Sequence, residues 1–159
     1  MERLTTTESN DVKIENDMGR DKFTPEERSW IMSRVKSRNT TPEVKLRREL
    51  WKRGLRYRVA TGNLPGKPDI LFPKAKVVVF VDGEFWHGHK LSNERLNRMS
   101  EYWRNKIHRN VERDINNNEL LKEMGFEVLR SFEQDVLKNT KTLADQIETT
   151  VKSRTRQKY

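Results

Sequence analysis

The stretch LPGKPDILFPKAKVVVFVDGEFWHGH, residues 64–89, tells more about this chain than any other segment. Residues 77–81 are apolar at every position, which predicts a short strand buried on both faces. Asp69 precedes one β-type run and Asp82 ends the next, and carboxylates at strand ends suit a hard cation such as Mg²⁺. His87 follows an aromatic pair, and a histidine can move a proton near neutral pH. This stretch therefore predicts both the central strand and the candidate chemistry.

The composition favours a nucleic-acid partner. A chain of 159 residues is long enough for one domain with a sizeable core. Its 33 Lys and Arg against 24 Asp and Glu give a net charge of +9, and such an excess favours a polyanion. Charge alone is weak evidence, because many soluble proteins are basic. Together with the strand-end acids, however, it predicts metal-dependent cleavage of nucleic acid.

Other features of the composition exclude several classes of protein. The chain has no cysteine, which excludes disulfides and any thiolate metal site and is compatible with a cytoplasmic location. No apolar run approaches the length of a membrane span, and the N-terminal segment lacks the apolar core of a signal peptide. We therefore expect a cytoplasmic protein without a membrane partner.

The pattern along the chain predicts one α/β domain. Residues 1–22 are polar and without periodicity, so we expect a disordered N-terminal tail, followed by a single domain over 23–152 and a basic, frayed tail over 153–159. Thr24-Pro25 and Thr41-Pro42 resemble helix starts, with Trp30 among the residues that the first helix would bury. The expected order is an α/β/α sandwich around a small mixed sheet. Helices are expected over about 24–38, 41–54, 100–124 and 135–152, and strands over 55–60, 69–72, 76–82 and 126–132, with 84–97 irregular.

Four motifs carry a resemblance to a known family: NTTPE at 39–43, LPGKPD at 64–69, VFVDGEFWHGH at 79–89 and WRNKIHRNVERD at 103–114. In this order and spacing they resemble the very short patch repair endonucleases, over roughly residues 25–135. Members of that family have a restriction-endonuclease-like fold and nick DNA beside the thymine of a T·G mismatch. The resemblance therefore implies a restriction-endonuclease-like α/β/α sandwich with a small mixed central sheet.

The resemblance also implies roles for residues of the central stretch. Asp69 matches the family's metal-binding aspartate and Val81 a position whose backbone carbonyl ligates the metal. The alternative for Asp69 is a solvated turn aspartate. His87 matches the active-site histidine, the best candidate to activate the attacking water, whereas a histidine outside such a motif is usually structural. The implied cofactor is Mg²⁺, held against the scissile phosphate.

Two further acids have less certain roles. Asp82 falls where family members carry a catalytic or water-positioning polar residue, histidine in some, and its alternative is a strand-end aspartate that caps a turn. Glu43 matches a family acid that approaches the active site. Its alternative is a first-turn acid favourable to the helix dipole, and both can hold at once.

The chain departs from the family at a metal site. Many members hold a structural zinc with cysteines and a histidine around this same loop. Here Glu84 occupies one cysteine position and His89 the histidine position, and no cysteine exists. A tetrahedral zinc site needs four suitable ligands. We therefore predict no structural zinc and a structural role for His89.

The resemblance assigns DNA reading to aromatic and polar side chains. Phe85, Trp86 and Trp103 match aromatic residues that wedge into the DNA stack, and unstacking is least costly at a mismatched step. Core burial is the alternative. Lys106 and Asn110 match residues that contact the mismatched pair, and they lie four apart on one helix face that could equally be simply exposed. Met32 matches a methionine that inserts from the opposite groove, or it is buried by its own helix.

The most specific reading is a Mg²⁺-dependent endonuclease that nicks 5′ to the thymine of a T·G mismatch, with double-stranded DNA as partner and a monomer as the expected state. Asp69, His87, Asp82 and Glu43 would carry the catalysis. One alternative is a restriction-type or structure-specific nicking enzyme of the same fold. Another is a DNA-binding module that does not cleave. The sequence identifies neither the preferred flanking bases nor the repair partners.

Overall fold

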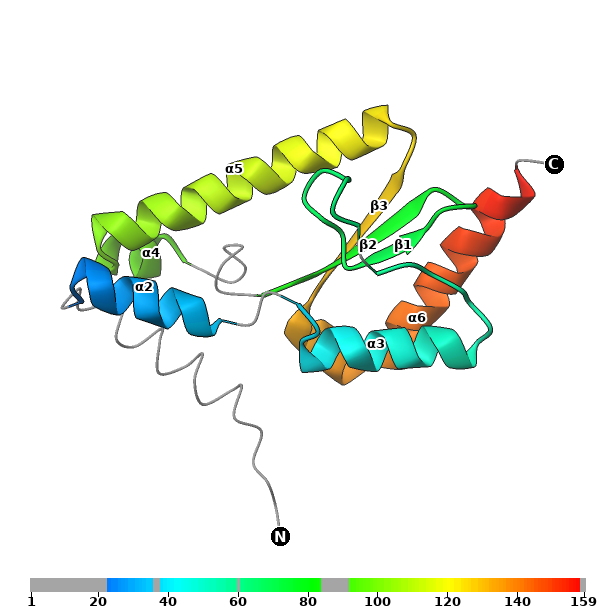
Figure 1. Ribbon diagram of the computed structural model, residues 1–159, viewed down its shortest axis with the longest axis horizontal. Helices are drawn as coiled ribbons and strands as arrows, with labels where there is room; N and C mark the ends of the chain where they lie inside the picture. The colour runs from blue at the N-terminus through cyan, green and yellow to red at the C-terminus, as the bar shows by residue number, and fades with distance from the viewer. Residues whose placement is uncertain (1–22, 36–37, 60, 84–91, 158–159) are drawn as a thin grey trace, which may run out of the picture.

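The computed structural model describes residues 23–35, 38–59, 61–83 and 92–157, which alternate helices with short strands (Figure 1). None of the helices in these ranges is long and apolar enough to cross a membrane. The elements are α2 (Pro25–Arg34), α3 (Thr41–Lys52), β1 (Ile70–Phe72), β2 (Val77–Asp82), α4 (Asn93–Arg98), α5 (Glu101–Glu123), β3 (Glu127–Phe132) and α6 (Glu133–Arg156).

The three strands form one mixed sheet in the order β1-β2-β3. β1 runs antiparallel to β2, with Ile70 opposite Val79. β3 runs parallel to β2, and its register places Arg130 opposite Phe80. The helix α5 makes the crossover that a parallel pair requires. The mixed character of the sheet was predicted from the sequence and is confirmed.

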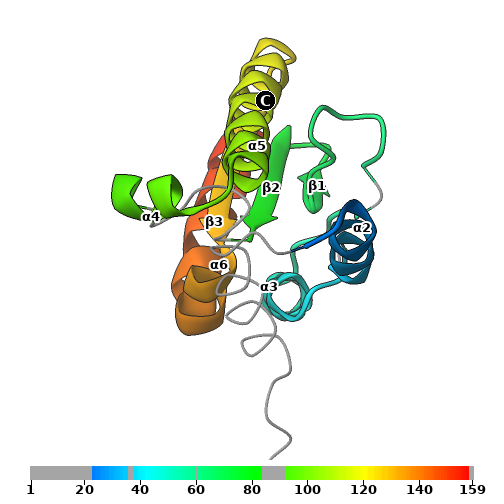
Figure 2. The same ribbon diagram turned by 90° about the vertical axis from the view of Figure 1, so that its left-hand side faces the viewer.

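Both faces of β2 are buried, as its unbroken apolar run predicts. Val77, Val79 and Val81 belong to a core cluster with side chains of α3 and α6. Val78 and Phe80 point to the other face and pack with residues of α5 and β3. Accordingly, α3 and α6 lie side by side on one side of the sheet and α5 runs along the other (Figures 1 and 2). The central strand is thus held between two helical layers.

A smaller group of helices lies beyond the end of β2. The N-terminal half of α5 extends past the sheet toward α4 and α2 (Figure 1). Met99, Trp103 and Ile107 form a buried cluster there, and Met32 of α2 and Leu96 of α4 pack against it. The last residue of β2 therefore faces the region between the sheet and this second helical group.

Short-range capping explains where the first two helices begin. The Thr24 hydroxyl accepts a hydrogen bond from Glu27 N at 3.2 Å, and Glu27 Oε2 accepts one from Thr24 N at 2.8 Å. This reciprocal pair is a capping box and confirms the predicted start of α2. In α3 the N-cap is Thr40, whose hydroxyl accepts from Glu43 N, so Thr41 is already the first helical residue.

The predicted strand over 55–60 does not form in the described residues 55–59. Only Arg58 bridges to Leu71, with backbone N···O distances of 2.8 Å in both directions. Leu55 is buried and Tyr57 packs its ring edge-on against Phe72 at 6.1 Å. Leu55 and Tyr57 are therefore held by packing rather than by a continued hydrogen-bonded ladder.

Two predicted helix boundaries also need correction. The first helix ends at Arg34 rather than near Arg38, and Trp30 is 58% exposed rather than buried. Its ring instead stacks on the guanidinium of Arg34, 4.2 Å from the ring centroid. The last helix continues to Arg156, beyond the predicted end at residue 152. Arg154 anchors this extra turn by donating to the backbone carbonyls of Ala75 and Gly125.

One helix was missed. Residues 84–97 were expected to be irregular, whereas α4 spans Asn93–Arg98. Its N-cap is Ser92, whose hydroxyl accepts a hydrogen bond from Arg95 N at 3.2 Å. A serine before a polar hexapeptide is a weak signal without an apolar stripe, because short helices depend on packing for their stability.

Candidate active site

Asp69 lies where β1 and β2 separate. Its backbone N donates to Val79 O at 3.0 Å, and its Oδ2 accepts from Val81 N at 2.7 Å. The side chain therefore continues the β1–β2 ladder by one step. A residue in an antiparallel pair presents its N–H and its C=O to the same neighbour, so the Val81 carbonyl faces the Asp69 side of β2.

A close approach holds the turn that delivers Asp69. Gly66 has φ +73°, and a Cβ at this position would lie 3.2 Å from the ring of Phe80 and 3.1 Å from Asn117 Nδ2. Only glycine meets both requirements without a shift of its neighbours. The Gly-Lys-Pro-Asp sequence thus turns directly against the central strand and fixes the position of Asp69, one residue before β1.

The electrostatic environment of Asp69 is unfavourable to its charge. Burial raises the pKa of Asp69 from its ordinary 3.8 to about 7, and the hydrogen bond from Val81 N lowers it only in part. The charges of Glu43 and Asp82 raise this pKa further, and Arg47 lowers it. The structure therefore brings Glu43, Asp69 and Asp82 into one electrostatic neighbourhood, with too little positive charge around Asp69 to offset its burial.

Glu43 sits in the first turn of α3, with only 5% of its surface exposed. Its Oε2 accepts from Asn39 N at 2.8 Å and lies 3.6 Å from Arg47 Nη2. Arg47 in turn donates to Asn39 Oδ1 at 2.8 Å. The local role considered for Glu43, a first-turn acid near the positive helix terminus, is therefore present, and its charge also reaches Asp69.

Asp82 is held by a residue that sequence reasoning missed. Arg130 of β3 donates from Nε to Asp82 Oδ2 at 2.7 Å and from Nη2 to Oδ1 at 3.1 Å. Such a bidentate pair fixes both oxygens in one plane. Because Asp82 is 7% exposed, this ion pair is shielded from water. The carboxylate is thus more than a turn cap: its orientation is set by Arg130.

Arg130 also ties the sheet to α5. Its Nη1 donates to Asn118 Oδ1 at 2.7 Å, its Nη2 lies 3.4 Å from Asp114 Oδ1, and its guanidinium carbon lies 4.2 Å from the centre of the Phe80 ring. One cation therefore joins the end of β2 to the middle of α5. The parallel register that places Arg130 opposite Phe80 makes this possible. The local sequence carries no signal for this pairing, because the register is set by strands that are distant in the chain.

Several predicted site residues lie outside the described part of the chain. They are Phe85, Trp86, His87 and His89, together with Glu84 of the loop for which no zinc is predicted. Their roles stay predictions. The described neighbours fix only where this segment leaves the sheet, directly after Asp82 and Gly83.

The predicted DNA-reading residues divide into two kinds. Trp103 is fully buried among Met99, Ile107 and Met32, so the structure favours the core alternative for Trp103 over a direct wedge. Met32, half-buried, packs on the same cluster. Burial of apolar rings in a domain core is the ordinary outcome, because it removes the largest apolar area from water.

Lys106 and Asn110 remain together on one face of α5, each half-buried. Burial lowers the pKa of Lys106, and the nearby charge of Arg109 lowers it further. The Asn110 side-chain oxygen accepts from Arg113 at 3.2 Å. Polar side chains at this depth are ordered by neighbours rather than freely solvated, which suits residues that present donors and acceptors to a ligand.

The protein groups available to a metal ion are few. No cluster of three or more His, Asp or Glu side chains able to hold a metal occurs among residues 23–35, 38–59, 61–83 and 92–157. The donors in place are the Asp69 carboxylate, whose Oδ1 accepts no hydrogen bond from the described residues, and the Val81 carbonyl. Such a sparse oxygen set fits Mg²⁺, which keeps several waters and takes substrate phosphate oxygens as ligands.

A small mixed sheet with acids near the end of its central strand, in a strongly basic chain, is typical of enzymes that hydrolyse nucleic-acid phosphodiesters. Comparison with known proteins agrees. The sequence model of the family described as DNA mismatch endonuclease Vsr matches residues 20–93. The type II nicking enzyme V.NmeDIP of Neisseria meningitidis serogroup C is 43% identical over 136 residues, covering 84% of this chain and 92% of that protein.

Two more relatives support the same assignment. The type II nicking enzyme V.HpaIIP of Haemophilus parainfluenzae is 36% identical over 137 residues, covering 84% of this chain and 97% of its own. The DNA mismatch endonuclease Vsr of Escherichia coli strain K12 is 37% identical over 103 residues, covering 64% of this chain and 66% of that protein. The chain therefore belongs to the Vsr family of DNA mismatch endonucleases, and it is an endodeoxyribonuclease.

Proposed function

We propose that this endonuclease nicks one strand of duplex DNA 5′ to the thymine of a T·G mismatch, such as arises from deamination of 5-methylcytosine, and that it requires Mg²⁺. The observation that supports this most is Asp69: a half-buried carboxylate at the edge of the central strand, with its pKa raised to about 7 and no cation bonded to it among the described residues. The fold supports the proposal as well, because helices on both faces of a small mixed sheet suit a restriction-endonuclease-like α/β/α sandwich.

The metal site would be built from few protein oxygens. Asp69 and the Val81 carbonyl would hold the ion, and the remaining positions suit water and phosphate. Bound there, Mg²⁺ supplies positive charge that stabilises the phosphate and the departing 3′ oxygen. The hydrogen bond from Val81 N to Asp69 Oδ2 fixes the carboxylate in place, so that ion binding does not have to order it first.

His87 is the proposed base for the attacking water. Asp82, whose two oxygens are fixed by Arg130, precedes His87 by five residues and would orient the water or the start of this segment. Glu43 would act through its negative charge at Asp69, held in place by Asn39 and Arg47. In this division of roles Asp69 and His87 carry the chemistry, while Asp82 and Glu43 shape its surroundings.

Recognition of the mismatch would involve the aromatic pair and α5. Phe85 and Trp86 are proposed to wedge into the stack at the weakly paired step, where unstacking is least costly. Lys106 and Asn110 would present a donor and a donor–acceptor to base edges. Trp103 would support them from within the core, with Lys106 Nζ 5.8 Å from the centre of its ring, and Met32 would anchor α2 there.

A second candidate is a nicking enzyme of the same fold that has another target. The relatives V.NmeDIP and V.HpaIIP, which are named type II nicking enzymes, favour this alternative. The remaining expectations are a single endonuclease domain over 23–152, a monomer and no structural zinc. Metal analysis of the purified protein that found one equivalent of tightly bound zinc would contradict the last.

A nicking assay tests the proposal. Strand-labelled duplexes that carry T·G, its matched T·A counterpart and other mismatches are incubated with the protein and Mg²⁺, or with EDTA. The expected result is a nick only in the thymine strand of T·G, only with the metal ion, and its loss in Asp69→Asn. Equal nicking of matched DNA would favour the second candidate, and nicking in EDTA would contradict the metal requirement.

A further inference from the structure

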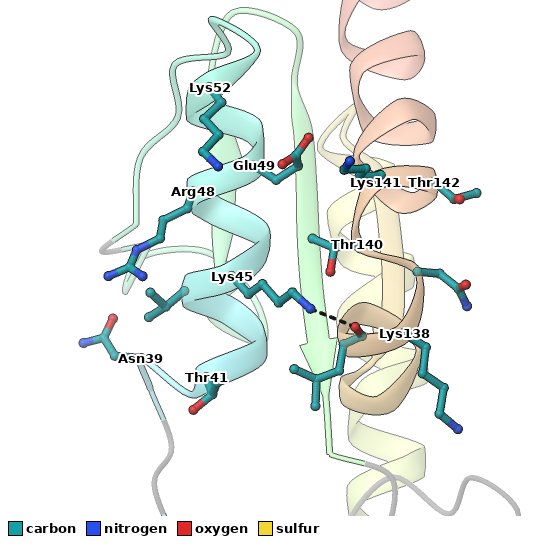
Figure 3. Close-up of a pocket in the computed structure, with 13 residues that line it drawn as sticks. Asn39, Thr41, Lys45, Arg48, Glu49, Lys52, Lys138, Thr140, Lys141 and Thr142 are labelled. Atoms are coloured by element: carbon teal, nitrogen blue, oxygen red, sulfur yellow. Dashed lines mark hydrogen bonds between the residues drawn. The ribbon is translucent and has the colours of Figure 1, made fainter. Parts of the chain in front are cut away.

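A groove of about 740 Å³ opens between α3 and the first turns of α6 (Figure 3). Its walls are residues 39–52 of the α3 side and 137–142 of the α6 side, and neither Asp69 nor Asp82 lines it. The two helices pack closely through their apolar faces beneath it. It is therefore a surface distinct from the candidate active site, on the outer side of one helical layer.

The groove is strongly basic. Among its lining residues the only acid is Glu49, whose Oε1 is 3.1 Å from Arg53 Nε and thus already paired. The cations, which come from both walls, are Lys45, Arg48, Lys52, Lys138 and Lys141.

Most of these cations have no counter-charge in the described structure. Lys45 reaches across the groove, where its Nζ donates to Leu137 O at 2.9 Å, two residues before the kink of α6 at Asn139 (Figure 3). No hydrogen bond or ion pair joins the side chains of the other four cations to any of the described residues. The groove therefore carries a net positive charge, which favours an anionic ligand.

The geometry suits an extended polyanion better than a small molecule. Lys45, Arg48 and Lys52 follow one face of α3 over seven residues, about 10 Å at 1.5 Å per residue. One DNA strand passes about three phosphates in this distance, at about 3.4 Å of helix axis each. Pockets for small ligands are mainly apolar, whereas here only Val44 and Leu137 contribute apolar side chains. Exposed lysines on an open groove are typical of phosphate contacts.

One end of the groove adjoins the candidate active site. Asn39 lines the groove, and its backbone N donates to Glu43 Oε2 at 2.8 Å. Asn39 and Thr41 lie at the end of the groove toward which β2 points, and Lys52 lies at the far end (Figure 3). A backbone whose scissile phosphate sits at Asp69 can therefore continue along α3.

We propose that this groove binds the DNA backbone beside the cleavage position, with Arg48 and Lys52 on its α3 wall and Lys138 and Lys141 on its α6 wall. The inference rests on the proposed function for the position of the scissile phosphate. It adds a contact with several phosphates on one flank, outside the mismatch itself. Affinity then depends on the length of DNA on that flank and carries a steeper salt dependence than the mismatch contacts alone provide.

The test compares Lys138→Gln/Lys141→Gln with a matched control, Lys122→Gln/Arg156→Gln. The control removes the same charge from exposed positions at the far ends of α5 and α6 (Figure 1). Binding of the full-length proteins to labelled T·G duplexes of about 12 and about 30 base pairs is measured by fluorescence anisotropy in EDTA over a salt series. Unfolding midpoints in urea confirm that all variants are folded.

The groove variant is expected to bind the longer duplex about tenfold more weakly than the unmodified protein and to reduce the slope of log K against log salt by about 1.8, for two lost phosphate contacts. Its loss on the shorter duplex should be smaller, and the control should match the unmodified protein on both. Equal losses on both duplexes, or a groove variant that behaves like the control, would overturn the proposal. Either result would be expected if the groove bound an acidic protein instead of DNA. Failure of the unmodified protein to nick T·G would refute the proposed function but leave a length-dependent difference standing.

Discussion

Replacing Asp69 by asparagine is expected to stabilise the metal-free protein at neutral and alkaline pH while abolishing cleavage. Asparagine is nearly isosteric and keeps an oxygen that can accept the hydrogen bond from Val81 N. The substitution removes only the charge that burial disfavours. Side chains that lower the stability of the fold are expected at positions where function determines the residue.

The magnitude follows from the pKa. Burial raises the pKa of Asp69 from 3.8 to about 7, a difference of about three units, and each unit corresponds to about 1.4 kcal/mol. Because the folded-state pKa lies above the unfolded-state value, the native state binds the proton more tightly, and stability falls as pH rises from about 4 to about 7. The free energy of unfolding of the unmodified protein should therefore fall by about 4 kcal/mol relative to Asp69→Asn between pH 4 and pH 8.

Urea unfolding of both proteins in EDTA at several pH values measures this difference. The change with pH is the diagnostic quantity, because any constant effect of burying the amide cancels. Glu119→Gln, on an exposed part of α5, is the control for the removal of a carboxylate. A stability difference between the unmodified protein and Asp69→Asn that stays within about 1 kcal/mol from pH 4 to pH 8 would refute the reasoning. Added Mg²⁺ should raise the stability of the unmodified protein and leave that of Asp69→Asn unchanged.

Three further predictions concern packing. Arg130→Met should destabilise the fold by about 3–5 kcal/mol because it leaves buried Asp82 unpaired, and a second change, Asp82→Asn, should recover much of the loss; additive effects in this double-mutant cycle would contradict the pairing. Trp103→Ala should lower the free energy of unfolding by about 3–5 kcal/mol, measured in urea, whereas a loss below about 1 kcal/mol would show that the ring is not a core residue. Gly66→Ala should lose about 1–3 kcal/mol and slow nicking, while Gly62→Ala, which has open space around it, should change neither; equal thermal midpoints for the two variants would argue against the close approach at Gly66.

The parts of the fold that local signals determine were predictable from the sequence. Thr24 begins α2 through a capping box whose two partners are three residues apart. The apolar run at 77–81 gives a strand buried on both faces, because nothing in it can face water. Gly54 and Gly125, both with φ above +80°, follow the ends of α3 and α5 where the sequence predicts those ends.

The parts that depend on distant pairing were not predictable. Whether residues 55–59 extend the sheet depends on their register against β1, and only Arg58 finds a partner. Arg130 is one of 33 basic residues, and nothing near it in sequence marks it as the partner of Asp82, 48 positions away. The sequence favours a wedge over a core ring for Trp103, whereas the packing of α2 and α4 around the buried ring favours the core, and this packing has no local signal in the sequence.

The length of α5 has a consequence for how the protein tolerates change. This single helix of 23 residues, about 34 Å long, carries Lys106 and Asn110 in its N-terminal half and the Arg130 contacts, Asp114 and Asn118, in its C-terminal half. The number of residues between these two groups fixes their relative position. One residue inserted between them would move them about 1.5 Å apart along the helix axis and rotate them by about 100° relative to each other. An insertion of seven residues, nearly two whole turns, would leave their relative rotation almost unchanged. The stretch of α5 between Asn110 and Asp114 should therefore tolerate replacement of its exposed side chains but not the insertion of a single residue.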